Sequence, residues 1–259
     1  MFEAIGNFFY VILYQPLFNS LVMLYNYLPG HDFGFAIIFL TIIIRVLLYP
    51  LSVKAVKSQA SLQKIQPVMQ EIQKKYKDDK EKQAKEILEL YKKEKVNPFS
   101  GLFLALLQLP ILWALYSVFF QGLDPKTLTA LYGFVANPGH INAVFLHLVD
   151  LAKPNLSFAV LAGLVQYFQT KMLLPKSKAK TGADGKGSDL SQAIQKQTMY
   201  FLPVFTVIIL INLPSALGLY WVVSGLFSVG QQYLILKNKD GANQKSGRQS
   251  VQTLQPKSN

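Results

Sequence analysis

One arginine, Arg45, lies inside the apolar run "IIFLTIIIRVLLYPL" at residues 37–51. A charged side chain near the centre of a membrane-spanning helix costs about 2.5–3.5 kcal/mol on insertion scales, so such residues usually serve a function. None of the apolar runs of the chain contains Asp or Glu, so Arg45 has no carboxylate partner of its own there. It can attract a negatively charged group, or it can extend along the helix to lipid headgroups about 10 Å away.

Polar residues in the same run favour the first of these alternatives. Thr41, Tyr49 and Ser52 are at i−4, i+4 and i+7 from Arg45 and share its face of a straight helix. An arginine that faces lipid needs no such polar face. The other runs carry amides, hydroxyls and aromatic side chains: Gln108, Gln166, Gln169, Thr170, Tyr220, Trp221, Ser224 and Ser228.

Each of these side chains alone is typical of a contact between packed helices. Together with an unpaired cation they predict a hydrated, positively charged cavity inside a helical bundle. The candidate site consists of these residues: Arg45, Thr41, Gln108, Gln166, Gln169, Tyr220, Trp221 and Ser224. A cavity without acids argues against a proton relay or a cation-coupled transporter, and favours a negatively charged ligand.

Enzymatic chemistry is not indicated. The chain has no cysteine, its three histidines lie outside the apolar runs, and no metal-ligand spacing appears. The segment "TGADGKGS" at 181–188 departs from the phosphate-loop spacing and is typical of a flexible link. We therefore expect no enzyme activity, no metal site and no cofactor.

The elements that must position these residues follow from composition. Of 259 residues, 51% are apolar and only 15% are charged, which is typical of a membrane protein. We predict an all-α polytopic membrane protein with five transmembrane helices, an amphipathic outer interfacial helix and a cytoplasmic helical hairpin. The expected order is the outer helix 1–30, span one 31–53, the cytoplasmic hairpin 54–97, span two 98–121, the outer loop 122–155, span three 156–174, a cytoplasmic loop 175–197, the span four and five hairpin 198–236, and a basic cytoplasmic tail 237–259. The alternative for residues 8–28 is a sixth span.

Basic residues predict the orientation. Segments 54–97, 171–196 and 237–259 contain 23 of the 26 Lys and Arg residues, and the positive-inside rule places them in the cytoplasm. With five spans, the chain then begins outside and ends inside. The tail has five Lys or Arg, one Asp and few apolar residues, so we expect it to be disordered.

The segment 54–97 is expected to form two amphipathic arms. Their apolar stripes are Ala60, Ile65, Met69, Ile72 and Tyr76 on the first arm, and Ala84, Ile87, Leu88 and Tyr91 on the second. Pro67 predicts a kink, and "KDDK" a turn. Such a hairpin is either a solvated linker or a docking element for a partner or lipid headgroups.

Five stretches in order resemble those of YidC-type membrane protein insertases, of the YidC/Oxa/Alb superfamily, over nearly the full chain. They are "YQPLFNSLVMLY", "GFAIIFLTIIIRVLLYPLSVKAVKSQ", "YKKEKVNPFSGLFLALLQLPILWALYSV", "LAGLVQYFQTKM" and "YFLPVFTVIILINLPSALGLYWVVSGLFSVGQQYLI". The resemblance implies a hydrophilic groove that is open to cytoplasm and lipid and closed outside. It places the groove arginine at Arg45, a groove amide at Gln166 or Gln169, and an aromatic residue at Trp221. The chain departs from the family at Gly225, where an Asn is frequent.

The resemblance implies a membrane insertase and chaperone in a bacterial plasma membrane. Its expected partners are nascent membrane proteins, notably single-span clients with acidic outer tails, the ribosome through the basic tail, and membrane lipids. A Sec-type translocon and a targeting receptor remain open as further partners. The alternative is an anion channel or transporter built around Arg45, and a structural assembly factor ranks third.

Overall fold

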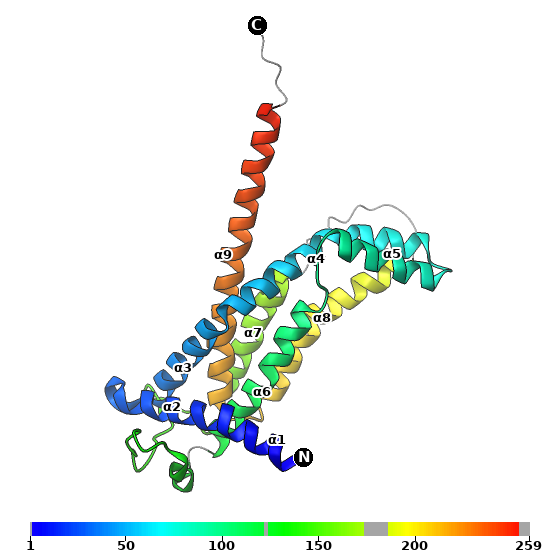
Figure 1. The fold of residues 1–259 in the computed structure, drawn as a ribbon. Helices are drawn as coiled ribbons and strands as arrows, with labels where there is room; N and C mark the ends of the chain where they lie inside the picture. Colours follow the sequence, from blue (N-terminus) through cyan, green and yellow to red (C-terminus); the bar gives the residue numbers. More distant parts are fainter. Residues whose placement is uncertain (1, 122–123, 174–185, 254–259) are drawn as a thin grey trace.

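The protein is a bundle of long helices with extended helical arms (Figure 1). The structure, a computed structural model, describes residues 2–121, 124–173 and 186–253. Its elements are α1 (Phe2–Phe9), η1 (Tyr10–Tyr14), α2 (Gln15–Tyr27), η2 (Pro29–His31), α3 (Phe33–Leu47), α4 (Tyr49–Lys75), α5 (Lys80–Lys93), α6 (Ser100–Gln121), η3 (Pro125–Ala130), β1 (Val144–Phe145), β2 (Val149–Asp150), α7 (Leu156–Leu173), α8 (Lys186–Leu210) and α9 (Ser215–Thr253). The mostly helical, apolar architecture agrees with the predicted class of an all-α membrane protein.

Membrane-length helices occur in the described part of the chain. Gly6–Tyr27 and Ser215–Lys237 are each long and apolar enough to cross a bilayer, and α3 with α4 make a third stretch if the bent pair counts as one span. Gln108–Phe120 and Met199–Leu210 are shorter apolar helices. The five-span layout therefore stays a prediction.

A 65° bend separates α3 from α4. It falls immediately before Pro50, which has no N–H to donate to the carbonyl of Val46, one turn earlier. The straight helix expected to run to residue 53 is interrupted for this reason. The common face predicted for Arg45, Tyr49 and Ser52 is wrong, because Tyr49 is exposed whereas Ser52 is buried beyond the bend.

Glycines allow α7 to lie close to its neighbours α8 and α9. A Cβ atom at Gly163 would overlap the side chain of Val207 in α8, and one at Gly225 would overlap Val165 in α7. Small residues are the usual means of close helix approach in membrane bundles. The departure from the family at position 225 thus fits this packing, since an Asn there has no room.

One end of the bundle, which we call the loop end, is formed by α1, α2 and residues 124–155. Figure 1 shows α1 and α2 crossing this end of the bundle rather than running alongside α9. The strands β1 and β2 pair antiparallel, Val144 with Asp150 and Phe145 with Val149. The all-α prediction did not include these two short strands. The crossing orientation favours an interfacial position for residues 8–28, and the alternative of a sixth span rests on their length and apolarity.

The opposite end, the hairpin end, carries the helical hairpin of α4 and α5 (Figure 1). Helix α4 continues through Pro67 without interruption. Ala60 and Ile65 are buried, whereas Leu88 in α5 is 58% exposed and α5 contains no buried residue. The apolar stripes therefore form only a thin contact.

Two helices are longer than expected. Helix α8 begins at Lys186, inside the predicted loop 175–197, of which residues 175–185 lie outside the described chain. Helix α9 continues to Thr253, past residue 237, where the predicted basic tail begins (Figure 1). Extending a helix that already exists costs no nucleation, and the tail has no proline before residue 256 to stop it.

Candidate functional site

Arg45 meets α9 in the interior of the bundle. It comes from the last turn of α3, and its Nε donates to Ser224 Oγ over 2.7 Å, with Nη2 donating to the same oxygen. Ser224 is only 3% exposed. No carboxylate lies within 4.0 Å of Arg45 among the side chains that the structure describes. The charge is therefore held by a neutral hydroxyl and is not neutralised.

A second polar contact lies one helical turn away. Gln108 Nε2 of α6 donates to the hydroxyl of Tyr220, which is almost fully buried. Because Tyr220 and Ser224 are four residues apart, they share one face of α9. That face therefore brings together Arg45 and Gln108, from two helices that are far apart in sequence.

The same face of α9 stays polar toward the hairpin end. Ser228 donates to the carbonyl of Ser224 over 3.0 Å, and Gln231 Nε2 donates to Ser52 Oγ of α4 over 2.6 Å. We call Tyr220, Ser224, Ser228 and Gln231 the α9 polar stripe. All four are buried, and eleven residues of helix make it about 16 Å long.

Trp221 faces a different helix. Its Nε1 donates to Gln166 Oε1 of α7 over 3.3 Å. One residue along a helix turns the side chain by about 100°, so Trp221 cannot share the face of Tyr220. Gln169 lies beside Gly225 of α9, where its Oε1 would touch an added Cβ at 4.0 Å. Both amides thus face α9, and neither is bonded to Arg45.

Thr41 does not join the polar cluster. It is 1% exposed, and its hydroxyl donates to the carbonyl of Ile37 over 2.6 Å. That bond satisfies its only proton inside α3, as is common for threonine in helices. Tyr49, which lies past the bend, is 41% exposed.

Sequence reasoning missed the end of the stripe nearest the hairpin. Gln231 and Gln232 are 5% and 3% exposed, and Oε1 of Gln232 is buried without a hydrogen-bond partner among the described residues. The signal that could have found them is the pair of adjacent glutamines in an apolar helix, because buried amides in membrane helices are costly and usually functional.

The arrangement is suited to holding a negatively charged or strongly polar group. A guanidinium has five N–H donors, and Ser224 is its only described acceptor, so donors remain for a ligand. No group of three or more His, Asp or Glu side chains that could hold a metal ion occurs in the described chain, and it has no cysteine. The chemistry that the described contacts support is electrostatic attraction and hydrogen bonding.

Comparison with known proteins gives one consistent family. Residues 23–244 match the family model described as 60Kd inner membrane protein. The chain is 33% identical over 227 residues to the membrane protein insertase YidC of Fusobacterium nucleatum, with 87% of this chain and 97% of that protein covered. It is 34% identical over 227 residues to the YidC of Syntrophus aciditrophicus, covering 36% of it, and 32% identical over 235 residues to that of Oleidesulfovibrio alaskensis, covering 40% of it. The chain thus spans well under half of the latter two relatives.

Proposed function

From the premise that the chain belongs to the 60Kd inner membrane protein family, as a YidC-type protein, we propose that it is a membrane protein insertase and chaperone. The observation that carries this proposal is Arg45, a cation with no carboxylate partner among the described residues, which is held by Ser224 of the buried α9 polar stripe. The stripe runs from the hairpin end to the middle of the bundle. We propose that a polar segment of a client reaches the charge along this stripe when the helices that cover it move apart.

The proposed mechanism needs no energy source other than transfer into lipid. The polar, often acidic, outer tail of a client enters a hydrophilic groove lined by the α9 polar stripe and moves toward Arg45. Its apolar segment meanwhile partitions into the bilayer, which releases about 25 cal/mol for each Å² of apolar surface removed from water. The groove lowers the barrier because it shortens the distance over which polar backbone crosses without water.

The proposed orientation places the hairpin end in the cytoplasm of a bacterial plasma membrane. The hairpin of α4 and α5 and the end of α9 contain most of the positive charge of the chain, and the positive-inside rule puts such segments inside. Five spans correspond to α3, α6, α7, α8 and the first part of α9. The loop end then lies outside and closes the groove there.

The basic residues of the cytoplasmic side indicate which partners bind there. The part of α9 beyond the bundle is basic and suits a salt-sensitive contact with the ribosome. The hairpin suits client delivery, with a Sec-type translocon or a targeting receptor as an open further partner. Deletion of residues 238–259 is expected to weaken co-sedimentation with ribosomes at low salt, and unchanged co-sedimentation would contradict the contact.

The decisive experiment is insertion of a small single-span client into protein-free liposomes that contain the purified chain and no nucleotide. A client with an acidic tail and a client with a Lys tail are each tested with the unmodified chain and with the Arg45→Glu variant. At an effective dielectric near 20, a charge pair at 4 Å is worth about 4 kcal/mol before desolvation. A net 1–2 kcal/mol remains, so we expect a roughly tenfold loss of insertion rate for the acidic client.

The controls separate charge from folding. Arg45→Lys should keep much of the activity because it keeps the charge, and Lys153→Ala removes an exposed cation of the loop end without effect on insertion. A double-mutant cycle without coupling between position 45 and the tail charge contradicts the electrostatic mechanism. Anion flux without insertion would instead support the channel or transporter.

A further inference from the structure

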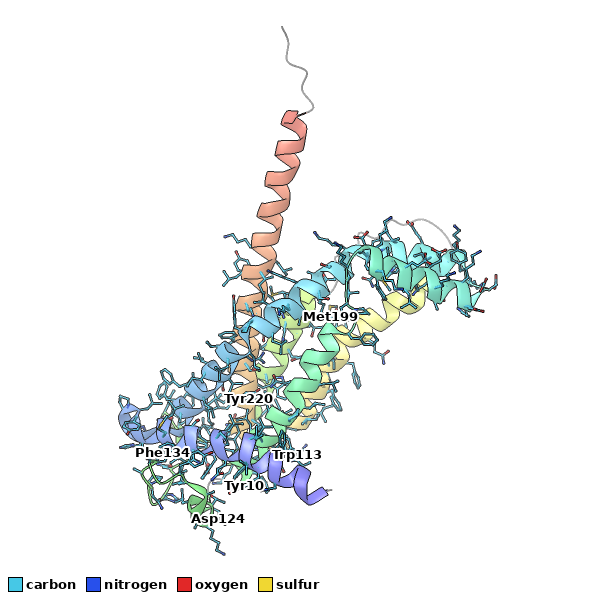
Figure 2. The ribbon with its side chains drawn as sticks, viewed as in Figure 1. Tyr10, Trp113, Asp124, Phe134, Met199 and Tyr220 are labelled. Carbon is cyan, nitrogen blue, oxygen red and sulfur yellow. The ribbon has the colours of Figure 1, made fainter. Side chains whose placement is uncertain are left out.

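A surface pocket of about 360 Å³ lies at the loop end, away from the polar stripe. Its wall is formed by η1 and the end of α1, by the end of α6, and by η3 of the loop. The lining residues are Gly6, Phe9, Tyr10, Tyr14, Ser117, Thr127, Thr129 and Ala130. Figure 2 shows Tyr10 at the same end of the molecule as Asp124, which immediately precedes η3. The volume is that of a site for a small molecule or a lipid headgroup.

The hydroxyl side of the pocket is made of hydrogen-bond acceptors. Ser117 Oγ donates to the carbonyl of Trp113 over 3.0 Å, Thr127 Oγ1 to that of Asp124 over 2.6 Å, and Thr129 Oγ1 to that of Lys126 over 3.0 Å. Each hydroxyl has one proton, and each proton is already used. While these bonds are kept, the three oxygens accept hydrogen bonds from a ligand, which supplies the donors.

The opposite side of the pocket is aromatic. Phe9, Tyr10 and Tyr14 line it, and the rings of Tyr10 and Tyr14 stack with centroids 5.3 Å apart. Their spacing depends on η1, a π-helical turn in which the N–H of Gln15 donates to the carbonyl of Tyr10, five residues earlier. Such turns are often found at functional sites. Aromatic rings opposite hydrogen-bond acceptors favour a cation that donates hydrogen bonds.

The acidic and basic residues around the pocket favour a positively charged ligand. In the sequence, residues 1–32 and 122–155, which include the loop end, contain four acids and two lysines. Asp124 is exposed at the start of η3, with its carboxylate accepting only the backbone N–H of Lys126 among the described residues. A ligand with no cationic group would meet three acceptor oxygens and this acid, so it is disfavoured.

Exposed apolar side chains next to the pocket indicate the source of the cation. Phe8, Val11 and Ile12 are 63%, 49% and 52% exposed, on the same helical segment as Tyr10. In a helix that crosses the end of a membrane bundle, such residues contact acyl chains. A ligand that has both an ammonium group and acyl chains satisfies the pocket and this apolar surface together.

We propose that this pocket binds the headgroup of a lipid with a primary ammonium group, as in phosphatidylethanolamine. The three N–H donors of the ammonium match the three acceptor oxygens in number, whereas a choline headgroup has the charge and no N–H donor. The proposal does not depend on insertase activity.

The test measures which lipid stays bound. The full chain is reconstituted in vesicles that contain equal amounts of phosphatidylethanolamine and phosphatidylcholine with some phosphatidylglycerol, then extracted gently and analysed by native mass spectrometry. We expect the ethanolamine lipid to be enriched roughly fivefold over the choline lipid, because a fivefold ratio corresponds to the net free energy of about one hydrogen bond. Mono- and dimethylated ethanolamine lipids keep the charge and lose donors, so their retention should fall stepwise.

Two sets of variants locate the site. Thr127→Val with Thr129→Val removes two acceptors at nearly constant volume, and Tyr10→Leu removes one ring; each should bring the bound ratio to that of the vesicle. Tyr27→Leu, an 83% exposed tyrosine on the adjoining α2, and Ser61→Ala, whose hydroxyl also donates to a backbone carbonyl in α4, are the matched controls and should keep the enrichment. Equal retention of the two lipids by the unmodified chain, or enrichment that survives in both pocket variants, would overturn the proposal.

Discussion

The loop end and the hairpin end differ in how their segments are held. At the loop end, polar side chains of the helices bind backbone groups of residues 124–153 from far along the chain. These bonds include Tyr132 N to Asn19 Oδ1 at 2.7 Å, Asn26 Nδ2 to Ala136 O at 2.7 Å, Asn142 N to the Tyr25 hydroxyl at 3.0 Å, and Leu146 N to Asp32 Oδ2 at 2.7 Å. The loop also accepts the N–H groups of Ser215 and Ala216 at the start of α9.

The hairpin end has a much thinner connection. Side-chain bonds between α4 and α5 include those of Gln83 to the carbonyl of Gln73 at 2.9 Å and of Tyr76 to Glu86 at 3.5 Å. Ser58 donates to the carbonyl of Asn97 beyond α5. With no buried residue in α5, little apolar surface adds to these bonds.

The difference indicates a division of labour between the two ends. A loop end tied to α2, α3 and α9 at once holds the helices in place and closes the bundle there. A hairpin with few contacts can move without disturbing the site, because low burial and sparse hydrogen bonds mark segments that open at low free-energy cost. Stability should therefore be concentrated at the loop end, and four predictions test this comparison.

The largest effect is expected for Asp32→Ala. One carboxylate oxygen of Asp32 accepts the N–H groups of Gly34 and Phe35 at the start of α3, and the other accepts that of Leu146. Loss of a helix cap and of a bond to a buried charged group should cost about 2–4 kcal/mol. Thermal unfolding in detergent, followed by tryptophan fluorescence, should shift down by roughly 5–15 °C.

The matched variant Asp32→Asn separates the two roles. Its amide oxygen keeps the cap, whereas its NH₂ group cannot accept from Leu146. We expect about half of the loss, and an effect of Asp32→Ala no larger than that of an exposed substitution would refute the concentration of stability at the loop end.

A smaller loss is expected for Gly34→Ala. A Cβ atom there would overlap the ring of Phe145, which also packs edge-on against Phe35 with centroids 5.6 Å apart. Overpacking of this kind costs typically about 1–3 kcal/mol. The same thermal measurement checks it, and Phe145→Leu in the same chain should recover part of the loss. Additive effects of the two substitutions would contradict the contact.

An exposed ion pair of the loop end should matter little. Lys153 Nζ lies 3.0 Å from Asp150 Oδ2, with the two side chains 79% and 35% exposed, and this hydrogen bond lowers the pKa of Asp150 below its ordinary value of 3.8. The stabilisation is complete above pH 3.8 and lost as the pH falls through the lowered pKa. Because solvent screens the pair, Lys153→Ala should raise this pKa, measurable by titration of the carboxyl resonance, and change stability by less than about 0.5 kcal/mol.

The smallest effect on stability is expected at the hairpin. Replacement of residues 76–82, the turn between α4 and α5 and the first three residues of α5, by a short Gly-Ser linker should leave thermal unfolding unchanged and lower insertion in the liposome assay. If the replacement instead destabilises the bundle, the hairpin is a structural brace and the contrast between the two ends is wrong.

Much of the architecture was predictable from local patterns. Helix α7 starts at Leu156, the residue at which span three is predicted to begin, and α9 starts at Ser215, inside the predicted hairpin 198–236. Apolar run length and the Pro before Ser215 are local signals for these two starts. The bend between α3 and α4 was missed although Pro50 was visible. A proline removes a hydrogen bond, and the packing around it decides whether the helix bends.

The amides of α2 illustrate the limit of sequence reasoning. Gln15, Asn19 and Asn26 interrupt the apolar stretch 8–28, and scattered amides of this kind are typical of a helix at the membrane interface. In the structure they donate to carbonyls of the loop more than 100 residues away, so their partner is protein rather than lipid headgroups. Both environments satisfy an amide equally well, and the side chain alone carries no information about which one it meets.

The sequence by itself determined the membrane class, the charge asymmetry, the family resemblance and the presence of an arginine without an acid in its apolar run. These depend on composition and on order along the chain, which folding does not alter. Only the tertiary structure decided that Arg45 meets Ser224, that Gln108 meets Tyr220, and that Thr41 turns its hydroxyl back into its own helix. Contacts between helices depend on the rotation of each helix about its axis, and one residue changes that rotation by about 100°. Periodicity shows which residues share a face, whereas the packing of the neighbouring helices decides what that face meets.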